Sequence, residues 1–381
     1  MPGGHQARTA LRRGFRLPAP SLRTVSTTAA ALIALRLAVY AALAPNGLAH
    51  DLCQWDCNWY LSIAESGYDL APHLVRGLWQ ANWAFFPLFP LLVRLTATLA
   101  GIAPTIAGAA VATVALWAFT VLGWLYRVRT RPNATPWPWL LLLAAWPYGF
   151  YFDAAYSESL YAALTVACLL ALQTGRPWLA AAACALVTAT RPTGALLAAW
   201  FGLHRLWRAR LVRSPTEALR LLAPAALAPL GILGFMAFLW RHVGDPFAFA
   251  TIQGAWGHSL RNPAAVLLDA LRAADPMNGR LGLIYLAGWA LLGLGAAGLL
   301  AAKRRPAEAW LCAATVLMAL LSGVVWSMPR FVACNPAFLL AAADVLEAVP
   351  SPGGQAILLL VFAAVQGVFL LGWFREAAFL M

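Results

Sequence analysis

Long apolar runs separated by short polar breaks dominate the pattern of this chain. An apolar helix needs about 20 residues to cross about 30 Å of hydrocarbon, and shorter helices suffice where they pack inside a bundle. The pattern therefore predicts an all-α, polytopic integral membrane protein with about eleven transmembrane helices. The predicted crossings lie at 24–45, 104–126, 137–152, 156–174, 177–190, 192–206, 221–240, 281–301, 308–326, 331–347 and 355–375.

The composition excludes an ordinary water-soluble domain. Of the 381 residues, 62% are hydrophobic and 11% are charged, and the mean hydropathy is +0.71. The formal net charge of +13 comes from an excess of arginine. In a membrane protein such an excess gathers in cytoplasmic loops, so we expect no nucleic-acid partner.

The positions of the arginines predict how the helices thread the membrane, because short cytoplasmic loops collect positive charge. We place the tail 1–23 and the basic segments 127–131, 205–220 and 303–305 on the cytoplasmic side. This threading requires that a twelfth apolar run, at 85–101, does not cross the membrane.

The run at 85–101 contains FFPLFPLLVRL. Two prolines in its first turns and the charge of Arg94 favour a re-entrant or surface helix at the outer interface. The alternative is an ordinary span, which would misplace the arginines of 127–131. On the first threading the acidic residues gather at the outer face: Asp51, Asp56, Glu65, Asp69, Asp153, Glu158, Asp245, Asp269 and Asp275.

The first polar cluster is QWDCNWYLSIAESGYD, residues 54–69. A helix over 52–66 places Asp56 on the same face as Trp59, and it places Glu65 on the opposite, solvent-facing side. Ionisable groups near the membrane are costly and are therefore functional candidates, and Asp56 is positioned to act on an amphiphilic substrate. The alternative is that Asp51 or Asp56 serves as a helix N-cap.

The second cluster is WPYGFYFDAAYSESLYAAL, residues 146–164. A polar break between two apolar runs is typical of a loop that lines a cavity, because irregular backbone in a membrane needs polar partners. Glu158 is a candidate to hydrogen-bond a sugar hydroxyl. We group Asp153 and Tyr156, and Trp59 of the first cluster, with it as acceptor- or sugar-binding residues. The alternative is that Glu158, with Ser157, caps the following helix.

Two arginines reach the outer face from other segments, Arg191 in TRPTG and Arg330 in WSMPRF. A guanidinium pairs in bidentate fashion with a carboxylate or a phosphate, so both arginines are candidates to bind a phosphate group. The alternative for each is a structural ion pair, for instance with Asp153 or Glu158.

The loop 241–280 offers an aromatic platform and a polar group, Trp256 and His258, of the kind that contacts sugars. The alternative for His258 is a hydrogen-bonded structural role. Among the six cysteines, Cys53 and Cys57 form a lone CxxxC that lacks further zinc ligands, and a bridge across one helical turn is geometrically awkward. We therefore expect no metal, no cofactor and no special chemistry from this pair.

Taken in order, WDCNWYLSIAESGY with AFFPLFPLL, FYFDAAYSESLYA, TRPTG, GDPFAFATIQGAWG and SMPRF resemble the PIG-V family of mannosyltransferases. This family contains the second-mannose enzymes of GPI-anchor synthesis and their bacterial relatives, within the GT-C glycosyltransferases. The similarity covers roughly residues 30–345. It implies a multi-helix membrane fold whose first external loop carries interfacial helices and a catalytic aspartate. It also implies a polyprenyl- or dolichyl-phosphate sugar donor, usually of mannose, and inversion at the anomeric carbon.

By motif position, the resemblance implies that Asp56 is the acidic catalytic residue and that Glu158 and Arg191 belong to the site. Two residues depart from the family pattern. Asp153 stands where relatives often have a small or hydroxyl residue, and Cys57 follows the aspartate. These departures bear on the acceptor rather than on the class of reaction.

Together these observations predict a hexosyltransferase, most simply a mannosyltransferase, in the plasma membrane with its site facing outside. Asp56 is expected to act as general base, while Arg330 and Arg191 neutralise the departing lipid phosphate. The expected partners are a polyprenyl-phosphate sugar, a glycolipid or cell-envelope acceptor, and the bilayer. The alternative function is a transporter or flippase of lipid-linked sugars.

The predicted organisation has three parts. A basic cytoplasmic tail occupies 1–23, and a catalytic module with the external loop 46–103 occupies 24–207. A C-terminal transmembrane module with the external loop 241–280 occupies 208–381.

Overall fold

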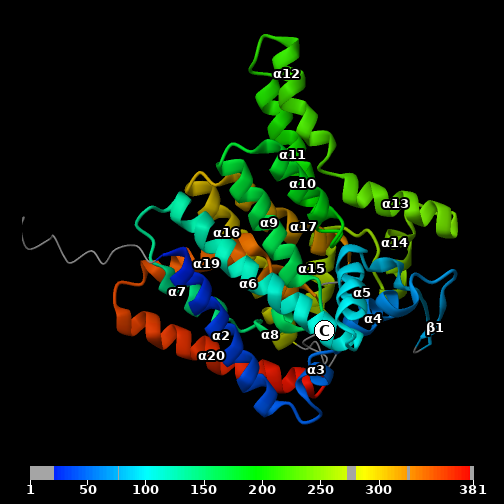
Figure 1. Ribbon diagram of the computed structural model, residues 1–381, viewed down its shortest axis with the longest axis vertical. Coiled ribbons are helices and arrows are strands. Elements are labelled where there is room, and N and C mark those ends of the chain that lie inside the picture. The colour runs from blue at the N-terminus through cyan, green and yellow to red at the C-terminus, as the bar shows by residue number, and fades with distance from the viewer. Residues whose placement is uncertain (1–20, 76, 273–279, 324–326, 378–381) are drawn as a thin grey trace, which may run out of the picture.

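The computed structural model describes residues 21–75, 77–272, 280–323 and 327–377. Residues 1–20 of the predicted tail, Asp275 and the side chain of Asp269 lie outside the described part. Over the described residues the fold is all-α, as predicted, with one short hairpin (Figure 1). In chain order, the elements are α2 (Leu22–Leu43), α3 (Leu48–Asp51), α4 (Asp56–Ser66), β1 (His73–Val75), β2 (Leu78–Gln80), η1 (Asn82–Ala84), α5 (Leu88–Ala100), α6 (Pro104–Thr130), α7 (Pro136–Ala145), α8 (Phe150–Asp153), α9 (Glu158–Gln173), α10 (Pro177–Thr188), α11 (Gly194–Ala209), α12 (Pro215–Leu222), η2 (Ala223–Ala226), α13 (Leu230–Val243), α14 (Ala248–Thr251), η3 (Ile252–Trp256), α15 (Pro263–Arg272), α16 (Arg280–Ala302), α17 (Pro306–Leu321), α18 (Met328–Ala333), α19 (Pro336–Ala348) and α20 (Pro352–Phe374).

Within the described residues, every predicted crossing overlaps one or more helices. Among the described residues, α2, α6 and α20 are long and apolar enough to cross a membrane on their own. The helical pair Pro215–Ala226 and Leu230–Val243, bent by 53°, is a candidate for a fourth span. Several further apolar helices are shorter, so helix length does not confirm the predicted count of about eleven crossings.

Prolines break two of the predicted crossings. The predicted span 137–152 is divided into α7 and α8, because Pro147 has no N–H to donate and favours an extended Trp146 before it (φ −60°, ψ 127°). The predicted span 331–347 is divided into α18 and α19. Between them Asn335 is extended before Pro336, and its side chain caps the N–H of Ala337. The chain therefore turns inside the bundle at both of these motifs.

The core of the bundle surrounds α6, which packs against α2, α5 and α9. Trp139 of α7 lies fully buried on α6, where its indole N–H donates to the carbonyl of Thr120 at 2.8 Å. The ring occupies the space beside Gly123, since a Cβ there would lie 2.2 Å from a ring carbon. Helix α7 also packs against α2 and α20.

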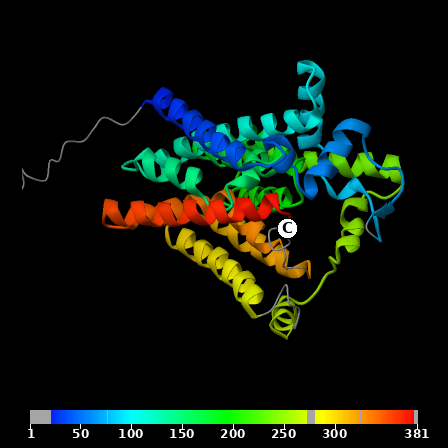
Figure 2. The same cartoon turned by 90° about the horizontal axis from the view of Figure 1, so that it is seen from below.

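A smaller apolar cluster holds the external loop against the rest of the molecule. Trp83 and Phe86, from the segment before α5, pack with Phe235 and Leu239 of α13. The hairpin β1–β2, α4 and α5 lie together at one end of the bundle in both views (Figures 1 and 2). The predicted external loop 46–103 is therefore a folded unit.

Helix α5 has 13 residues, a length of about 20 Å at 1.5 Å per residue. Arg94 on this helix is exposed. That this segment lies along the outer interface without crossing the membrane stays a prediction.

The predicted helix over 52–66 begins later, at Asp56, because Trp55 before it has a positive φ of 42°. Cys53 therefore lies outside the helix and is joined to Cys57 by a disulfide, with their Cα atoms 5.1 Å apart. Our expectation that this pair would not bridge was wrong. It assumed that both cysteines lie on one helical turn, whereas the helix starts between them.

A group of charges ties together the ends of α6, α17 and α19. Asp344 accepts from Arg127 at 2.8 Å and from Lys303 at 3.1 Å. The threading had assigned 127–131 and 303–305 to one side of the membrane, and here the two segments meet. We call this group the distal cluster: Arg127, Arg131, Lys303, Arg305, Glu308, Asp344 and Glu347.

Candidate active site

Asp56 is the first residue of α4, and one tyrosine fixes the backbone around it. The N–H of Asp56 donates to the hydroxyl oxygen of Tyr156 at 3.1 Å, and that hydroxyl donates to the carbonyl of Gln54 at 2.7 Å. The Asp56 side chain pairs with Arg330 and keeps 32% of its surface exposed. Glu65 is exposed, as expected for an acid on the solvent-facing side of the helix.

Asp56 joins an alternating set of two carboxylates and two guanidinium groups. Arg330 pairs through Nη1 with Asp56 Oδ2 and through Nε with Glu158 Oε1, both at 2.5 Å. Arg191 Nη1 pairs with the same Glu158 oxygen at 2.5 Å. We call Asp56, Glu158, Arg191 and Arg330 the site cluster. Its formal charges sum to zero.

The members of the site cluster lie at helix starts, in a short helix or in a turn between helices. Glu158 is the first residue of α9, Arg191 lies in the turn between α10 and α11, and Arg330 lies in α18. The sequence predicts all four residues at one face, and the structure brings them into contact. The structural alternative for the arginines, an ion pair with Glu158, is also present. The alternative that Ser157 caps the following helix is not observed, since its side chain makes no cap hydrogen bond.

The guanidinium of Arg330 lies over two aromatic rings, 4.6 Å from the centroid of Tyr156 and 5.3 Å from that of Tyr151. Such stacking orients the planar group and favours its positive charge. Tyr60 of α4 shares a hydrogen bond of 2.8 Å with Ser157, and burial raises the pKa of its phenol to about 12. The site cluster is therefore framed by neutral tyrosines.

A small cavity of about 20 Å³ lies on the bundle side of Arg191 and Arg330, space for about one water molecule. Glu158 Oε2 and Thr193 Oγ1 are buried without a hydrogen-bond partner among the described residues. This cavity is too small for a sugar, whereas Asp56 keeps an exposed side. Within the described residues, no group of three or more His, Cys, Asp or Glu side chains is placed to hold a metal.

Two of the predicted sugar-binding aromatics meet at the edge of the site. The rings of Trp59 and Trp256 are 5.9 Å apart, and Phe85 stacks on Trp59 at 5.9 Å. His258 follows two residues after Trp256 and is half-buried, and this burial lowers its pKa. The loops at 46–103 and 241–280 therefore build one aromatic surface.

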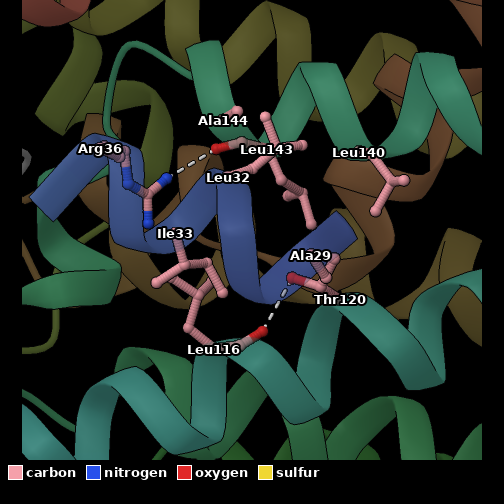
Figure 3. A pocket seen from close by; sticks show the side chains of 9 residues that line it. All are labelled: Ala29, Leu32, Ile33, Arg36, Leu116, Thr120, Leu140, Leu143 and Ala144. Carbon is pink, nitrogen blue, oxygen red and sulfur yellow. Dashed lines mark hydrogen bonds between the residues drawn. The ribbon is translucent and has the colours of Figure 1, made fainter. Parts of the chain in front are cut away.

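Asp153 lies elsewhere. It is fully buried and pairs with Arg36 of α2 at 2.8 Å rather than with either arginine of the site cluster. Arg36 also donates to the carbonyl of Leu143 at 2.7 Å, at one end of a small apolar pocket between α2, α6 and α7 (Figure 3). Sequence reasoning missed Arg36, although a lone arginine inside an apolar helix signals a buried acidic partner.

Comparisons with known proteins agree with the motif analysis. The family described as Mannosyltransferase (PIG-V) matches residues 19–210, a segment that contains three members of the site cluster. The GPI alpha-1,6-mannosyltransferase 2 of Mus musculus is 30% identical over 215 residues, which cover 51% of this chain and 41% of that protein. The enzyme of the same name from Cricetulus griseus is 29% identical over 204 residues, covering 49% and 39%. The chain thus matches less than half of the length of these relatives.

Among solved structures, the chain is similar to the apo form of the Archaeoglobus fulgidus oligosaccharyltransferase, with a TM-score of 0.45 and 13% identity. That match covers 92% of this chain and 56% of the other. The archaeal oligosaccharyltransferase AglB from the same organism, in complex with an inhibitory peptide and a dolichol-phosphate, has a TM-score of 0.44 and 15% identity, with coverage of 92% and 56%. The family match extends over half of the chain, which therefore belongs to the PIG-V family of mannosyltransferases.

Proposed function

We propose that this protein is a GT-C-type membrane glycosyltransferase that transfers a hexose, mannose, from a polyprenyl-phosphate donor to a lipid-linked or cell-envelope acceptor. The observation that supports this most directly is the site cluster. It combines a partly exposed carboxylate with two arginines in a member of a mannosyltransferase family. A lipid-phosphate donor needs a base for the acceptor and cations for the leaving phosphate, and the cluster holds both.

In the proposed reaction, Asp56 takes the proton of the acceptor hydroxyl as its oxygen attacks the anomeric carbon. The bond between that carbon and the phosphate oxygen breaks, and its electron pair leaves with the phosphate. Arg330 and Arg191 stabilise the negative charge that develops there. Attack from the side opposite the leaving group inverts the anomeric carbon, and no covalent enzyme intermediate is required.

The different surroundings of the two carboxylates support an order of events. Glu158 is buried and contacts both arginines, whereas Asp56 is partly exposed and contacts only Arg330 within the cluster. An arriving phosphate competes most readily with Asp56 for Arg330. Donor binding would then release Asp56 from its ion pair and free it to act as a base.

The aromatic surface formed by Trp59 and Trp256 is assigned to the sugar or the acceptor, together with His258. Tyr156 is assigned instead to holding the backbone at Asp56, because its side chain is buried and its hydroxyl bonds Gln54 and Asp56. Aromatic rings and nearby polar groups provide the amphipathic contacts that a sugar needs. Asp153 is left out of this set, because its carboxylate is buried against Arg36.

We assign the site cluster to the outer face of the plasma membrane and the distal cluster to the cytoplasmic side. The meeting of the basic segments 127–131 and 303–305 in one cluster supports this assignment, because positive charge is retained in the cytoplasm. A cysteine introduced at the exposed Arg129 tests it. An impermeant thiol reagent is expected to label Arg129→Cys only in opened cells, and labelling of intact cells would refute the orientation.

The function is tested by transfer from a radiolabelled polyprenyl-phosphate mannose to membrane lipids. The parent should transfer the label and Asp56→Ala should not. Glu65→Ala is the matched control, because Glu65 is an exposed acid on the other face of the same helix. Undiminished transfer by Asp56→Ala would remove that residue from the mechanism. The relatives give no support to the transporter alternative, which predicts movement of the lipid-linked sugar without transfer.

A further inference from the structure

The disulfide between Cys53 and Cys57 encloses Asp56. The loop that it closes contains only Gln54, Trp55 and Asp56 between the two cysteines. Cys57 is fully buried in α4, one residue after the carboxylate. The proposed base is therefore held next to a covalent cross-link.

The backbone inside this loop has a conformation that needs support. Trp55 has a φ of 42°, in a region that residues other than glycine rarely adopt. Its ring packs edge-on against Trp373 at 4.7 Å, and the Tyr156 hydroxyl bridges the Gln54 carbonyl and the Asp56 N–H. Ring packing, these two hydrogen bonds and the disulfide together define where α4 starts and hence where Asp56 points.

Both arginines of the site have an anchor outside this loop, although Arg330 also pairs with Asp56. Arg191 lies in the turn between α10 and α11, Arg330 lies in α18, and the buried Glu158 links them. Opening the disulfide would therefore release the base without releasing the cations that bind the donor phosphate.

We propose that the Cys53–Cys57 disulfide positions Asp56 for catalysis, so that transfer depends on the oxidation state of this pair. The inference rests on the proposed function of Asp56. Disulfides form and persist in oxidising compartments, so the bond also agrees with a site on the outer face. Its formation removes two protons and two electrons from the two thiols, and these pass to a protein or small-molecule disulfide of that compartment, which becomes a dithiol.

The experiment compares transfer by the parent before and after reduction with dithiothreitol, whose two thiols are oxidised to a cyclic disulfide. Reduction is expected to lower kcat about 10- to 100-fold, the effect of a small displacement of a catalytic group. KM for the donor is expected to change less than about 2-fold, because the arginines keep their anchors. Reoxidation should restore kcat.

The double variant Cys53→Ser/Cys57→Ser is the matched control. It should have the low kcat of the reduced parent and should not respond to dithiothreitol. Asp56→Ala should keep the disulfide but lack transfer. The bond itself is measured without any transfer assay, by maleimide labelling of the denatured protein. Of the six cysteines, Cys53 and Cys57 should be labelled only after reduction.

Labelling of Cys53 and Cys57 without reductant would overturn the disulfide, whatever the activity. An intact disulfide whose reduction leaves kcat unchanged would overturn the positioning role. If the parent transfers no mannose, the proposed function fails and the positioning role fails with it. Maleimide labelling then still shows whether the Cys53–Cys57 disulfide is present, so failure of the proposed function is distinguished from absence of the disulfide.

Discussion

The site cluster and the distal cluster use the same kinds of side chain in different arrangements. In the distal cluster, Asp344 pairs with four cations, Arg127, Arg131, Lys303 and Arg305. Its side chain is 1% exposed. In the site cluster two acids face two arginines, and the Asp56 side chain keeps 32% of its surface exposed.

This difference distinguishes a structural cross-link from the proposed reactive site. Asp344 makes so many ion pairs that no ligand can displace it without breaking the contacts between the ends of α6, α17 and α19. Asp56 has one cationic partner within its cluster and an open side, so a phosphate can take its place. We therefore expect the distal cluster to support stability, and the site cluster to support the proposed chemistry.

The largest expected effect is that of Asp344→Asn on stability. The variant leaves buried Arg127 and its neighbouring cations without their common counter-charge, which costs about 3–5 kcal/mol. The midpoint of thermal unfolding in detergent should fall markedly, while transfer per folded molecule stays near that of the parent. Glu65→Gln, at an exposed site, is the control and should unfold like the parent. A variant that unfolds normally but loses transfer would show that the distal cluster has a catalytic role.

The next effect is that of Arg330→Lys on transfer. Lysine keeps the charge but loses the planar fork that contacts Asp56 and Glu158 together. We expect kcat to fall about 10²- to 10³-fold, the usual loss on removing one donor to a developing anion. Arg131→Lys, in the distal cluster, is the control and should retain transfer. Equal activity of the two variants would contradict the separation of roles.

Tyr156→Phe removes the hydroxyl that bridges the backbone of Gln54 and Asp56 but keeps the ring over Arg330. Two hydrogen bonds are lost, which amounts to about 1–3 kcal/mol. The expected result is a lower kcat with an unchanged donor KM, measured by transfer against donor concentration. A higher KM with normal kcat would instead place Tyr156 in donor binding.

The smallest effect is expected for Arg131→Gln. The Arg131 side chain is 37% exposed, and ion pairs at such positions contribute about 1 kcal/mol or less. Thermal unfolding should therefore shift only slightly. A loss of stability as large as that of Asp344→Asn would mean that Arg131, rather than Arg127, is the main ion-pair partner that holds these helix ends together.

Some features of the site followed from the sequence because they are local. Helical periodicity alone assigned Asp56 and Glu65 to opposite faces. The threading argument assigned Asp56, Glu158, Arg191 and Arg330 to one side, since positive-inside bias restricts which ends of the helices can meet. The roles of these residues remain predictions.

Other features depend on packing between distant segments. The pairing of Asp153 with Arg36 could not be predicted, because α2 and α8 meet only through the fold. The disulfide was missed because the start of a helix is uncertain by a residue or two from sequence. The pairs Arg127–Asp344 and Lys303–Asp344 required knowledge of which helix ends adjoin.

The most direct test of the separation between the clusters measures transfer per folded molecule and thermal unfolding in Asp56→Asn and Asp344→Asn side by side. The account predicts that Asp56→Asn unfolds near the parent and loses about 10²- to 10⁴-fold in kcat, as expected for removal of a general base. It predicts the reverse for Asp344→Asn, with a large loss of stability and near-normal transfer from the folded fraction. Normal transfer by Asp56→Asn, or a loss that only follows its unfolding, would contradict the account.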